Sequence, residues 1–491
     1  MSNHTTTFRS CLLLWVLTYC GLAIGVEIQT VPIGLTDNLD DVNRVANDGT
    51  CCYGAVPYKY RIGQYEVTNE QYTEYLNAIA ASDPYDVYNP EMGTHIRGGI
   101  SRSGESGSYT YSVRPNMANK PVNFILVWDA MRFVNWLHNG QPTGAQDAST
   151  TEDGVYTLNG VNSFSWTEPF DAPKNNTVGR NEGARWFLPS EDEWYKSAYY
   201  DPRTEAQGGP PGDTHYWYYG TQSNQAPQLA RTDAEGNVIN PGPNVANYRH
   251  SALWNSAVGN VANVGGANSA TYFGAFDQAG NVWEWTDTII EKSFSDGLRP
   301  YRGVRGGCWD DWFWMFNAFR RPYGGDNSGD CHGLRVARAF SADDLNGDGT
   351  LDVEDIDLLS AQVRQRTLNT AYDLDDDQIV DRDDRRFWVE HVAKTYFGDA
   401  NLDGQFNSSD IVHVSTINEY EDGIEANSTW ATGDWDGDGE FSSGDFVYAF
   451  MHDGYELGPR QSRIAAVPEP SCGIIVLLIF AVALRSSFVR K

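Results

Sequence analysis

The sequence is organised around one stretch, Phe276-Asp277-Gln278-Ala279-Gly280-Asn281-Val282-Trp283-Glu284-Trp285-Thr286-Asp287. Glu284 stands between two tryptophans, just after a Gly-Asn turn. Indole rings favour burial, and a carboxylate buried between them needs a partner. A calcium ion bound by Asp277, Glu284 and carbonyl oxygens of the turn would supply one. An arginine paired with Glu284 in a tryptophan-rich core strand is the alternative.

Further segments around this stretch occur in a recognisable order. They are Arg61-Ile-Gly-Gln-Tyr-Glu-Val-Thr-Asn-Glu-Gln-Tyr72, Pro121-Val-Asn-Phe124 with Trp128-Asp129-Ala130, Arg185-Trp-Phe-Leu-Pro-Ser-Glu-Asp-Glu-Trp194, Arg305-Gly-Gly-Cys-Trp309 and Gly333-Leu-Arg-Val-Ala337. With Gly280-Asn-Val-Trp-Glu-Trp285 they resemble the formylglycine-generating enzyme (sulfatase-modifying factor) family over about residues 55–340. Several ordered motifs are far more specific than one. The resemblance implies an α+β, C-type-lectin-like fold with low regular secondary structure, held together by Ca²⁺.

Local patterns predict the main elements of this domain. Thr68 and Gln71 form a capping box before apolar residues at helical spacing, and Ser190 and Glu193 form a second one before a helix that ends near Tyr199. A helix is expected over 127–138, and strands over 58–63, 185–188 and 216–221. Long loops between few elements are typical of an α+β domain.

Composition limits the possible functions. The chain has 491 residues, which is enough for two or more domains, and its 13% aromatic content and 48 glycines favour a loop-rich fold. The formal charge of −31 argues against nucleic-acid binding, which needs a basic face, and fits a protein that binds cations. Residues 341–460 hold 29 acidic and 7 basic side chains, so −22 of this charge lies there.

Both ends carry targeting patterns. Arg9 precedes an apolar run over 11–25 that ends in small residues, which predicts a signal peptide. The other end has Val467-Pro-Glu-Pro470, an apolar run over 473–484 and terminal basic residues. This end resembles the bacterial Pro-Glu-Pro sorting tail (PEP-CTERM), with a plain transmembrane C-terminal anchor as the alternative. Either tail implies at least transient membrane contact, and we expect a bacterial protein exported to the cell surface, outer envelope or outside.

These patterns divide the chain into seven parts. We expect a signal peptide over 1–25, an irregular leader or edge strand over 26–54, the family-like domain over 55–340, two repeat pairs over 341–397 and 398–456, a linker over 457–470 and a hydrophobic sorting tail or anchor over 471–491.

Four acidic loops with one spacing follow the family-like domain. Oxygen-bearing side chains stand at positions 1, 3, 5, 9 and 12, an apolar residue stands at position 8, and glycine stands at position 6 in three of the four. We call residues 344–355, 373–384, 399–410 and 434–445 loops 1 to 4. Their predicted calcium ligands are Asp344, Asn346, Asp348, Thr350, Asp352 and Asp355; Asp373, Asp375, Asp377, Asp381 and Asp384; Asp399, Asn401, Asp403, Asn407 and Asp410; and Asp434, Asp436, Asp438, Ser442 and Asp445.

These loops are EF-hand-like, and a disordered acidic tract would not keep ligands and apolar residues in register. Aspartate at position 12 resembles dockerin modules, which implies small all-α units and a cohesin-like partner. Loop 2 departs from the pattern, because Gln378 stands where glycine belongs. The same loops are equally consistent with a spacer, stiffened by Ca²⁺, between the domain and the cell surface. The partner itself, a protein or a surface polysaccharide, is not specified.

The family resemblance implies an oxidase that uses O₂ and copper to convert a cysteine of a client sulfatase to formylglycine. Two thiolates hold its copper, at positions that correspond here to Asp311 and Phe316, and neither residue can supply a thiolate. Asp310, Asp311, Asp326 and Asp330 form a possible carboxylate cluster for acid–base work, although Gly/Asp loops near a calcium site explain them equally well.

Four cysteines remain after the predicted signal and tail are set aside: Cys51, Cys52, Cys308 and Cys331. In an exported chain the favoured pairing is a structural Cys308–Cys331 disulfide, and a copper pair from these two in a rearranged site is the catalytic alternative. Adjacent cysteines such as Cys51 and Cys52 rarely bridge each other, and their pairing stays open.

Matched positions also place two calcium sites in the family-like domain. The resemblance implies Asp277 and Glu284 side chains with Gly280 and Val282 carbonyls for one, and Asn247 and Tyr248 with a later acidic group for the other. The leading hypothesis is therefore an exported calcium-binding protein whose family-like domain serves binding or structure. A divergent oxidase acting on exported peptides and a cohesin-binding assembly module are the alternatives.

Overall fold

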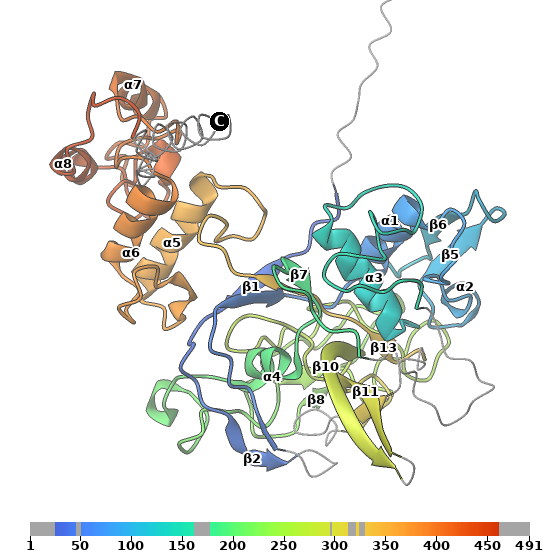
Figure 1. Cartoon of the computed structure of the whole chain (residues 1–491). Coiled ribbons are helices and arrows are strands. Elements are labelled where there is room, and N and C mark those ends of the chain that lie inside the picture. The colour runs from blue at the N-terminus through green and yellow to red at the C-terminus, as the bar shows by residue number, and fades with distance from the viewer. Residues whose placement is uncertain are drawn as a thin grey trace, which may run out of the picture.

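The computed structural model describes residues 25–45, 51–161, 177–294, 297–312, 321–323 and 329–460. Most of the predicted signal peptide, the end of the linker and the whole predicted tail lie outside these residues. Among the helices described, none is long and apolar enough to cross a membrane. The described residues form two large hydrophobic cores, one built from residues between Val26 and Ala337 and one from residues between Leu345 and Ala449, and a small third cluster of Ala230, Val245 and Ala267. The helices of the second core lie together beside the larger first unit (Figure 1).

An antiparallel four-stranded sheet closes the first unit by joining its two ends. Its order is β1 (Thr30–Ile33), β4 (Tyr60–Gly63), β14 (Ala337–Ala339) and β7 (Trp186–Phe187). The predicted strand over 58–63 is thus present, and part of the leader serves as an edge strand. Because β14 lies beside β4, the last motif of the family-like domain pairs with the first.

The second four-stranded sheet contains the stretch with the two tryptophans. It is ordered β12 (Arg321–Tyr323), β11 (Gly297–Arg305), β10 (Trp283–Phe294) and β13 (His332–Gly333). Strands β10 and β11 form a long hairpin, and Glu284 pairs across it with Arg305. On its other edge Glu284 lies beside Gly333 in a parallel pair, which brings the two signature motifs together.

Three helices support these sheets, and two begin at the predicted capping boxes. Helix α1 (Asn69–Ile79) starts after Thr68, and α4 (Glu191–Tyr199) starts after Ser190. In both helices, the hydroxyl of the N-cap residue accepts a hydrogen bond from the backbone amide of residue N3. The side chain of residue N3 in turn accepts a hydrogen bond from the backbone amide of the N-cap residue. Helix α3 (Val127–His138) is buried along almost its whole length.

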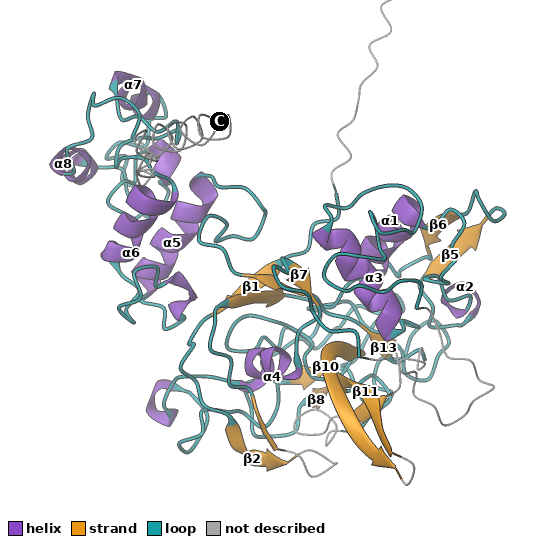
Figure 2. Cartoon of the chain, in the orientation of Figure 1, coloured by secondary structure: helices purple, strands orange, loops and turns teal. Residues whose placement is uncertain are grey.

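Loops make up much of the first unit (Figure 2). The smaller elements are α2 (Glu91–Thr94), η1 (Glu205–Gln207) and the two-stranded pairs β2 (Asp41–Val45) with β3 (Cys51–Tyr53), β5 (Ile100–Ser103) with β6 (Thr110–Val113), and β8 (Gln228–Leu229) with β9 (Val245–Ala246). The strand expected over 216–221 is wrong: Tyr216 and Tyr219 make only isolated bridges. Their rings pack edge-on against neighbouring tyrosines, so aromatic packing explains the pattern.

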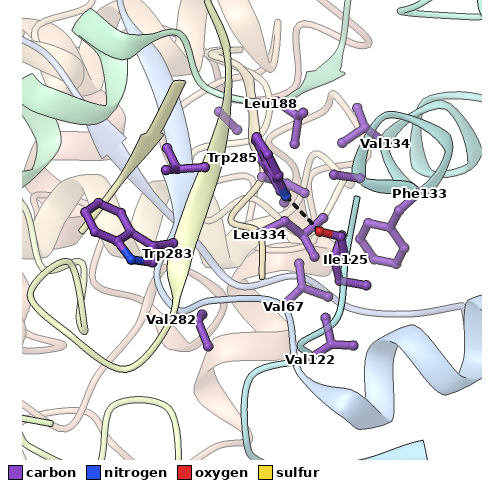
Figure 3. Packing of buried hydrophobic residues seen from close by; sticks show 14 of the residues in the cluster. Val67, Val122, Ile125, Phe133, Val134, Leu188, Val282, Trp283, Trp285 and Leu334 are labelled. Atoms are coloured by element: carbon purple, nitrogen blue, oxygen red, sulfur yellow. Dashed lines mark hydrogen bonds between the residues drawn. The ribbon is translucent and has the colours of Figure 1, made fainter. Parts of the chain in front are cut away.

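Large side chains from distant segments meet in the first core. Figure 3 shows Trp285 with Leu334, Ile125 and Phe133 close by. The Trp285 indole nitrogen donates to the Ile125 carbonyl at 2.9 Å, so the polar edge of this fully buried ring is satisfied. The indoles of the signature stretch therefore anchor the domain, as their burial preference predicts.

The second unit contains four main helices. They are α5 (Val353–Gln365), α6 (Arg382–Phe387), α7 (Ser408–Ser415) and α8 (Ser443–Met451), with the shorter turns η3 (Thr370–Tyr372), η4 (Trp388–Val392) and η5 (Trp430–Thr432). Each main helix begins directly after position 9 of an acidic loop, whose side chain caps it. Loop and helix thus form one repeating unit.

The cysteines of the first unit form two disulfides. Cys308 and Cys331 are bonded, with their Cα atoms 5.6 Å apart. Cys51 and Cys52 are bonded to each other, contrary to the general expectation for neighbours, and Cys52 has a positive φ of 101°.

Candidate functional site

Glu284 has an arginine partner. Its carboxylate is fully buried and accepts two hydrogen bonds from Arg335, at 2.7 and 2.8 Å, and one from the Trp194 indole at 2.6 Å. Arg335 is fully buried too, and it also donates to the carbonyls of Gly63 and Phe276. The arginine alternative from the sequence is therefore present in the structure.

Two more carboxylates face the same guanidinium. Glu66 accepts from the side chain of Asn281 at 2.8 Å and from the Val282 amide at 3.2 Å, and Asp277 accepts from the Gly265 amide. Burial raises the pKa of Asp277 to about 6 and, with the charge of Asp277, raises the pKa of Glu66 well above its ordinary value. The single positive charge of Arg335 thus faces three buried carboxyl groups.

This excess of negative charge is the observation that bears on the predicted calcium site. A divalent cation near Asp277 would offset the charge that Arg335 leaves unbalanced. The Oε1 atom of Glu284 accepts one hydrogen bond from Arg335 and has a second lone pair for a ligand. The donor set of Asp277, Glu284 and the Gly280 and Val282 carbonyls therefore fits calcium chemically, and binding there stays a prediction.

Two residues of the second predicted calcium site make direct hydrogen bonds to neighbouring loops. Asn247 donates its amide to the Asn260 carbonyl at 2.8 Å and to the Asn281 side chain at 3.0 Å, while its own carbonyl accepts the Asn281 amide. Tyr248 donates its hydroxyl to the Pro227 carbonyl. Asn247 and Tyr248 thus tie loops together through direct hydrogen bonds, and calcium binding at this second site stays a prediction.

The copper positions of the family are occupied by groups that cannot hold Cu(I). The Asp311 carboxylate accepts the Cys308 amide at 3.0 Å, and Phe316 lies outside the described residues. Cys308 and Cys331 share a disulfide, so neither offers a thiolate. The residues described here do not fit the copper centre, and the catalytic reading of this cysteine pair is wrong for the disulfide form.

The aspartates near this disulfide point to separate partners. Asp330 pairs with Arg97 at 3.0 Å, and Asp310 pairs with His250 at 2.9 Å. Arg97 also lies over the Trp309 ring, 4.0 Å from its centroid. Because each carboxylate is engaged elsewhere, the predicted acid–base cluster does not form among the described aspartates, and Asp326 lies outside them.

The acidic loops share one hydrogen-bonding scheme. At position 12, one oxygen of Asp355 accepts the amides of Leu345 and Asn346, and its other oxygen accepts the Asp352 amide. Asp384 accepts the same three amides in loop 2, whereas Asp410 accepts those of positions 2 and 9 in loop 3 and Asp445 those of positions 3 and 9 in loop 4. At position 1 each aspartate accepts the amide of the sixth residue. The scheme gathers the acidic side chains around the loop centre.

Two of the loops bring three carboxylates close enough for one cation. In loop 2 these are Asp373, Asp375 and Asp377, and in loop 4 they are Asp434, Asp436 and Asp445, with one oxygen from each residue lying within 4.8 Å of the others. Carboxylate oxygens are the ligands that Ca²⁺ prefers. Loop 2 gathers its acids although Gln378 replaces glycine, and Gln378 takes a positive φ of 72°.

The sequence did not predict that Arg335, Glu66 and Trp194 lie together with Glu284 and Asp277 in one buried group. A signal for them was present, since all three lie in the quoted motifs. The sequence did not show how those motifs pair in space. In the structure, strands β10 and β13 bring the motif of Glu284 beside the motif of Arg335.

These features define a class of protein: a mixed α+β domain with long loops. Its first and last motifs pair with each other, and a strand with buried tryptophans lies in its core. The chain belongs to the sulfatase-modifying factor family: the model of the sulfatase-modifying factor enzyme 1-like domain matches residues 55–340. These bounds coincide with those expected from the motifs.

Comparison with solved structures gives matches at low identity. Variable protein 1 of Treponema denticola is 16% identical, with a TM-score of 0.36, and the match covers 64% of this chain and 96% of that one. The crystal structure of CarF is 16% identical with a TM-score of 0.34, covering 64% and 99%. PvdO from Pseudomonas aeruginosa is 17% identical with a TM-score of 0.30, covering 64% and 92%. No curated protein matches the chain.

Proposed function

We propose that this protein is an exported, surface-associated calcium-binding protein whose sulfatase-modifying-factor-type domain serves binding or structure and no longer oxidises cysteine. One observation carries this proposal: Cys308 is bonded to Cys331, and Asp311 stands at one of the two expected cysteine positions. A Cu(I) site of this family needs two thiolates. With Asp311 and Phe316 at those two positions and the nearby cysteines bonded to each other, the domain keeps the fold without the metal ligands.

The direct test is an assay for the family reaction. The full chain is incubated with a cysteine-containing sulfatase peptide, copper and O₂, beside a family member that has both cysteines as the positive control. We expect no aldehyde product by mass spectrometry from this chain. An aldehyde formed only in its presence would support the divergent oxidase.

Calcium binding is the second half of the proposal, and the acidic loops support it. Loops 2 and 4 gather three carboxylates each, and burial raises the pKa of the position-12 groups Asp384 and Asp445 to about 6. A bound cation would stabilise the ionised form of such groups. We expect calcium to raise the thermal unfolding temperature and EDTA to reverse the effect. The Asp445→Asn variant should lose one equivalent of bound calcium, and an unchanged stoichiometry would argue against loop 4.

Assembly through a protein partner is a second candidate because helix α8 exposes apolar side chains. Val447 is 59% exposed, Phe450 46% and Met451 74%, at the end of the second unit away from the first (Figure 1). Such a surface is typical of partner binding. A cohesin-like partner predicts calcium-dependent capture that is lost when Asp399 and Asp434 are changed to Ala. Capture that persists in EDTA would refute the dockerin-like mode.

A further inference from the structure

Loop 1 is held by two arginines of the sulfatase-modifying-factor-type domain. Arg61 of β4 is buried and donates to the carbonyls of Leu345 at 2.6 Å and Asn346 at 3.0 Å. Arg338 of β14 pairs with the Asp344 carboxylate and donates to the Gly347 carbonyl at 2.9 Å. The two strands that close the first unit therefore also hold the first acidic loop of the second.

Loop 4 is held in the same way by arginines of its own unit. Arg385, which is buried, donates to the Trp435 carbonyl at 3.1 Å. Arg364 donates to the Gly437 carbonyl at 3.0 Å and approaches the Asp434 carboxylate at 3.4 Å. The loop positions are the same in both cases: the carbonyls of positions 2 and 4 and the carboxylate of position 1.

Glycine at position 4 makes this close approach possible. A Cβ added to Gly347 would lie 2.8 Å from an Arg61 nitrogen, and one added to Gly437 would lie 2.5 Å from an Arg385 nitrogen. Loops 2 and 3 carry Asp376 and Leu402 at this position. Loops 1 and 4 are thus built to receive a pair of arginines, and only in loop 1 does the pair come from the other domain.

We propose that Arg338 acts as an internal counter-cation for loop 1 and competes with calcium for Asp344, which makes loop 1 a weak calcium site while the two units are docked. This inference rests on the proposed calcium function of the loops. One Asp344 oxygen accepts the Gly349 amide, and the other pairs with Arg338. A divalent ion on that carboxylate would lie within a few ångströms of the guanidinium, and like charges at such distances repel strongly in a partly buried site.

The docking of the two units does not depend on Arg338 alone, so the arginine can be changed in the intact chain. The Gly34 amide donates to the Asn369 side chain at 3.0 Å, and Asn369 donates back to the Pro32 carbonyl at 2.9 Å. Lys59 donates to the Asp373 carbonyl at 2.5 Å. These contacts join the leader and the residue before β4 to Asn369 and to the first residue of loop 2.

The test compares calcium titrations of four full-length chains by calorimetry: wild type, Asp344→Asn, Arg338→Gln, and the variant with both changes. Glutamine keeps a donor for the Gly347 carbonyl but removes the charge. We expect Arg338→Gln to bind one extra equivalent of calcium at least tenfold more tightly than wild-type loop 1, and the double variant to lose that equivalent. Arg338→Lys, which keeps the charge, should behave like wild type.

Two results would overturn the inference alone, and a third would overturn it together with the proposed function. The first is an Arg338→Gln isotherm equal to the wild-type isotherm while other loops bind calcium, which would leave the proposed function intact. The second needs no arginine variant: loss of a tight site from wild type on Asp344→Asn would mean that Arg338 does not weaken loop 1. Absence of calcium binding in every chain would refute the proposed function and this inference together.

Discussion

Replacing Arg335 with methionine should destabilise the sulfatase-modifying-factor-type domain more than any exposed charge change. Arg335 is fully buried and makes four hydrogen bonds, two to Glu284 and one each to the carbonyls of Gly63 and Phe276. Methionine fills much of the volume but satisfies none of these acceptors. Glu284 would remain buried without its positive partner, beside Asp277 and Glu66.

Breaking a buried ion pair from one side costs about 3–5 kcal/mol of unfolding free energy, because the remaining charge stays desolvated. The two orphaned carbonyls add to this loss, so we expect a value at the upper end of that range. Arg386→Met is the matched control. Its pair with Asp383 is 3.7 Å long and more than half exposed on both sides, and such pairs contribute under about 1 kcal/mol.

The assay is urea unfolding of both variants, followed by tryptophan fluorescence, with the double variant Arg335→Met/Glu284→Leu to close a cycle. We expect the double variant to be more stable than Arg335→Met alone, because it removes the uncompensated carboxylate. If Arg335→Met cost no more than Arg386→Met, the buried pair would not be what satisfies Glu284.

Three further predictions concern stability. Burial raises the pKa of Asp129 from 3.8 to about 8, so the unfolding free energy should fall as pH rises from about 4 to 8. Asp129→Asn should reduce this slope in urea titrations across that range, and the raised pKa values of Asp277 and Glu66 should leave part of it in place. Ser190→Ala removes the hydroxyl that caps α4 and should cost about 1 kcal/mol in the same assay, and no loss would argue against the cap. Changing Cys308 and Cys331 together to Ser opens a loop with a sequence separation of 23 and should cost about 3 kcal/mol, measured beside the reduced wild type, which should be equally destabilised.

Local signals were enough to predict much of this fold from the sequence. The capping boxes at Thr68 and Ser190 lie within four residues of chain, and both helices begin where they predict. The repeating spacing of the acidic loops marked four units in register, and in the structure position 9 of each loop caps one of the helices α5 to α8. Such patterns need no knowledge of distant contacts.

The features that were missed depend on contacts between distant segments. The sequence showed that Glu284 needs a partner, but the choice of Arg335 depends on the pairing of β10 with β13. The hydrogen bond from Arg61 to the Leu345 carbonyl in loop 1 joins residues 284 positions apart, and no local sequence pattern predicts it. Near Tyr216 a local pattern gave a wrong prediction. The aromatic run suggested a strand, but the residues make only isolated bridges because the Tyr216 ring packs against a tyrosine outside the run.

The redox state of one cysteine pair tests the central claim most directly. The full chain, purified without reductant, is denatured, alkylated and digested, and its peptides are mapped by mass spectrometry while bound metals are quantified in the native protein. We expect Cys308 and Cys331 in one cross-linked peptide and no stoichiometric copper. Free thiols at both positions, together with bound copper that is lost on Cys308→Ser, would contradict a domain that has given up oxidation.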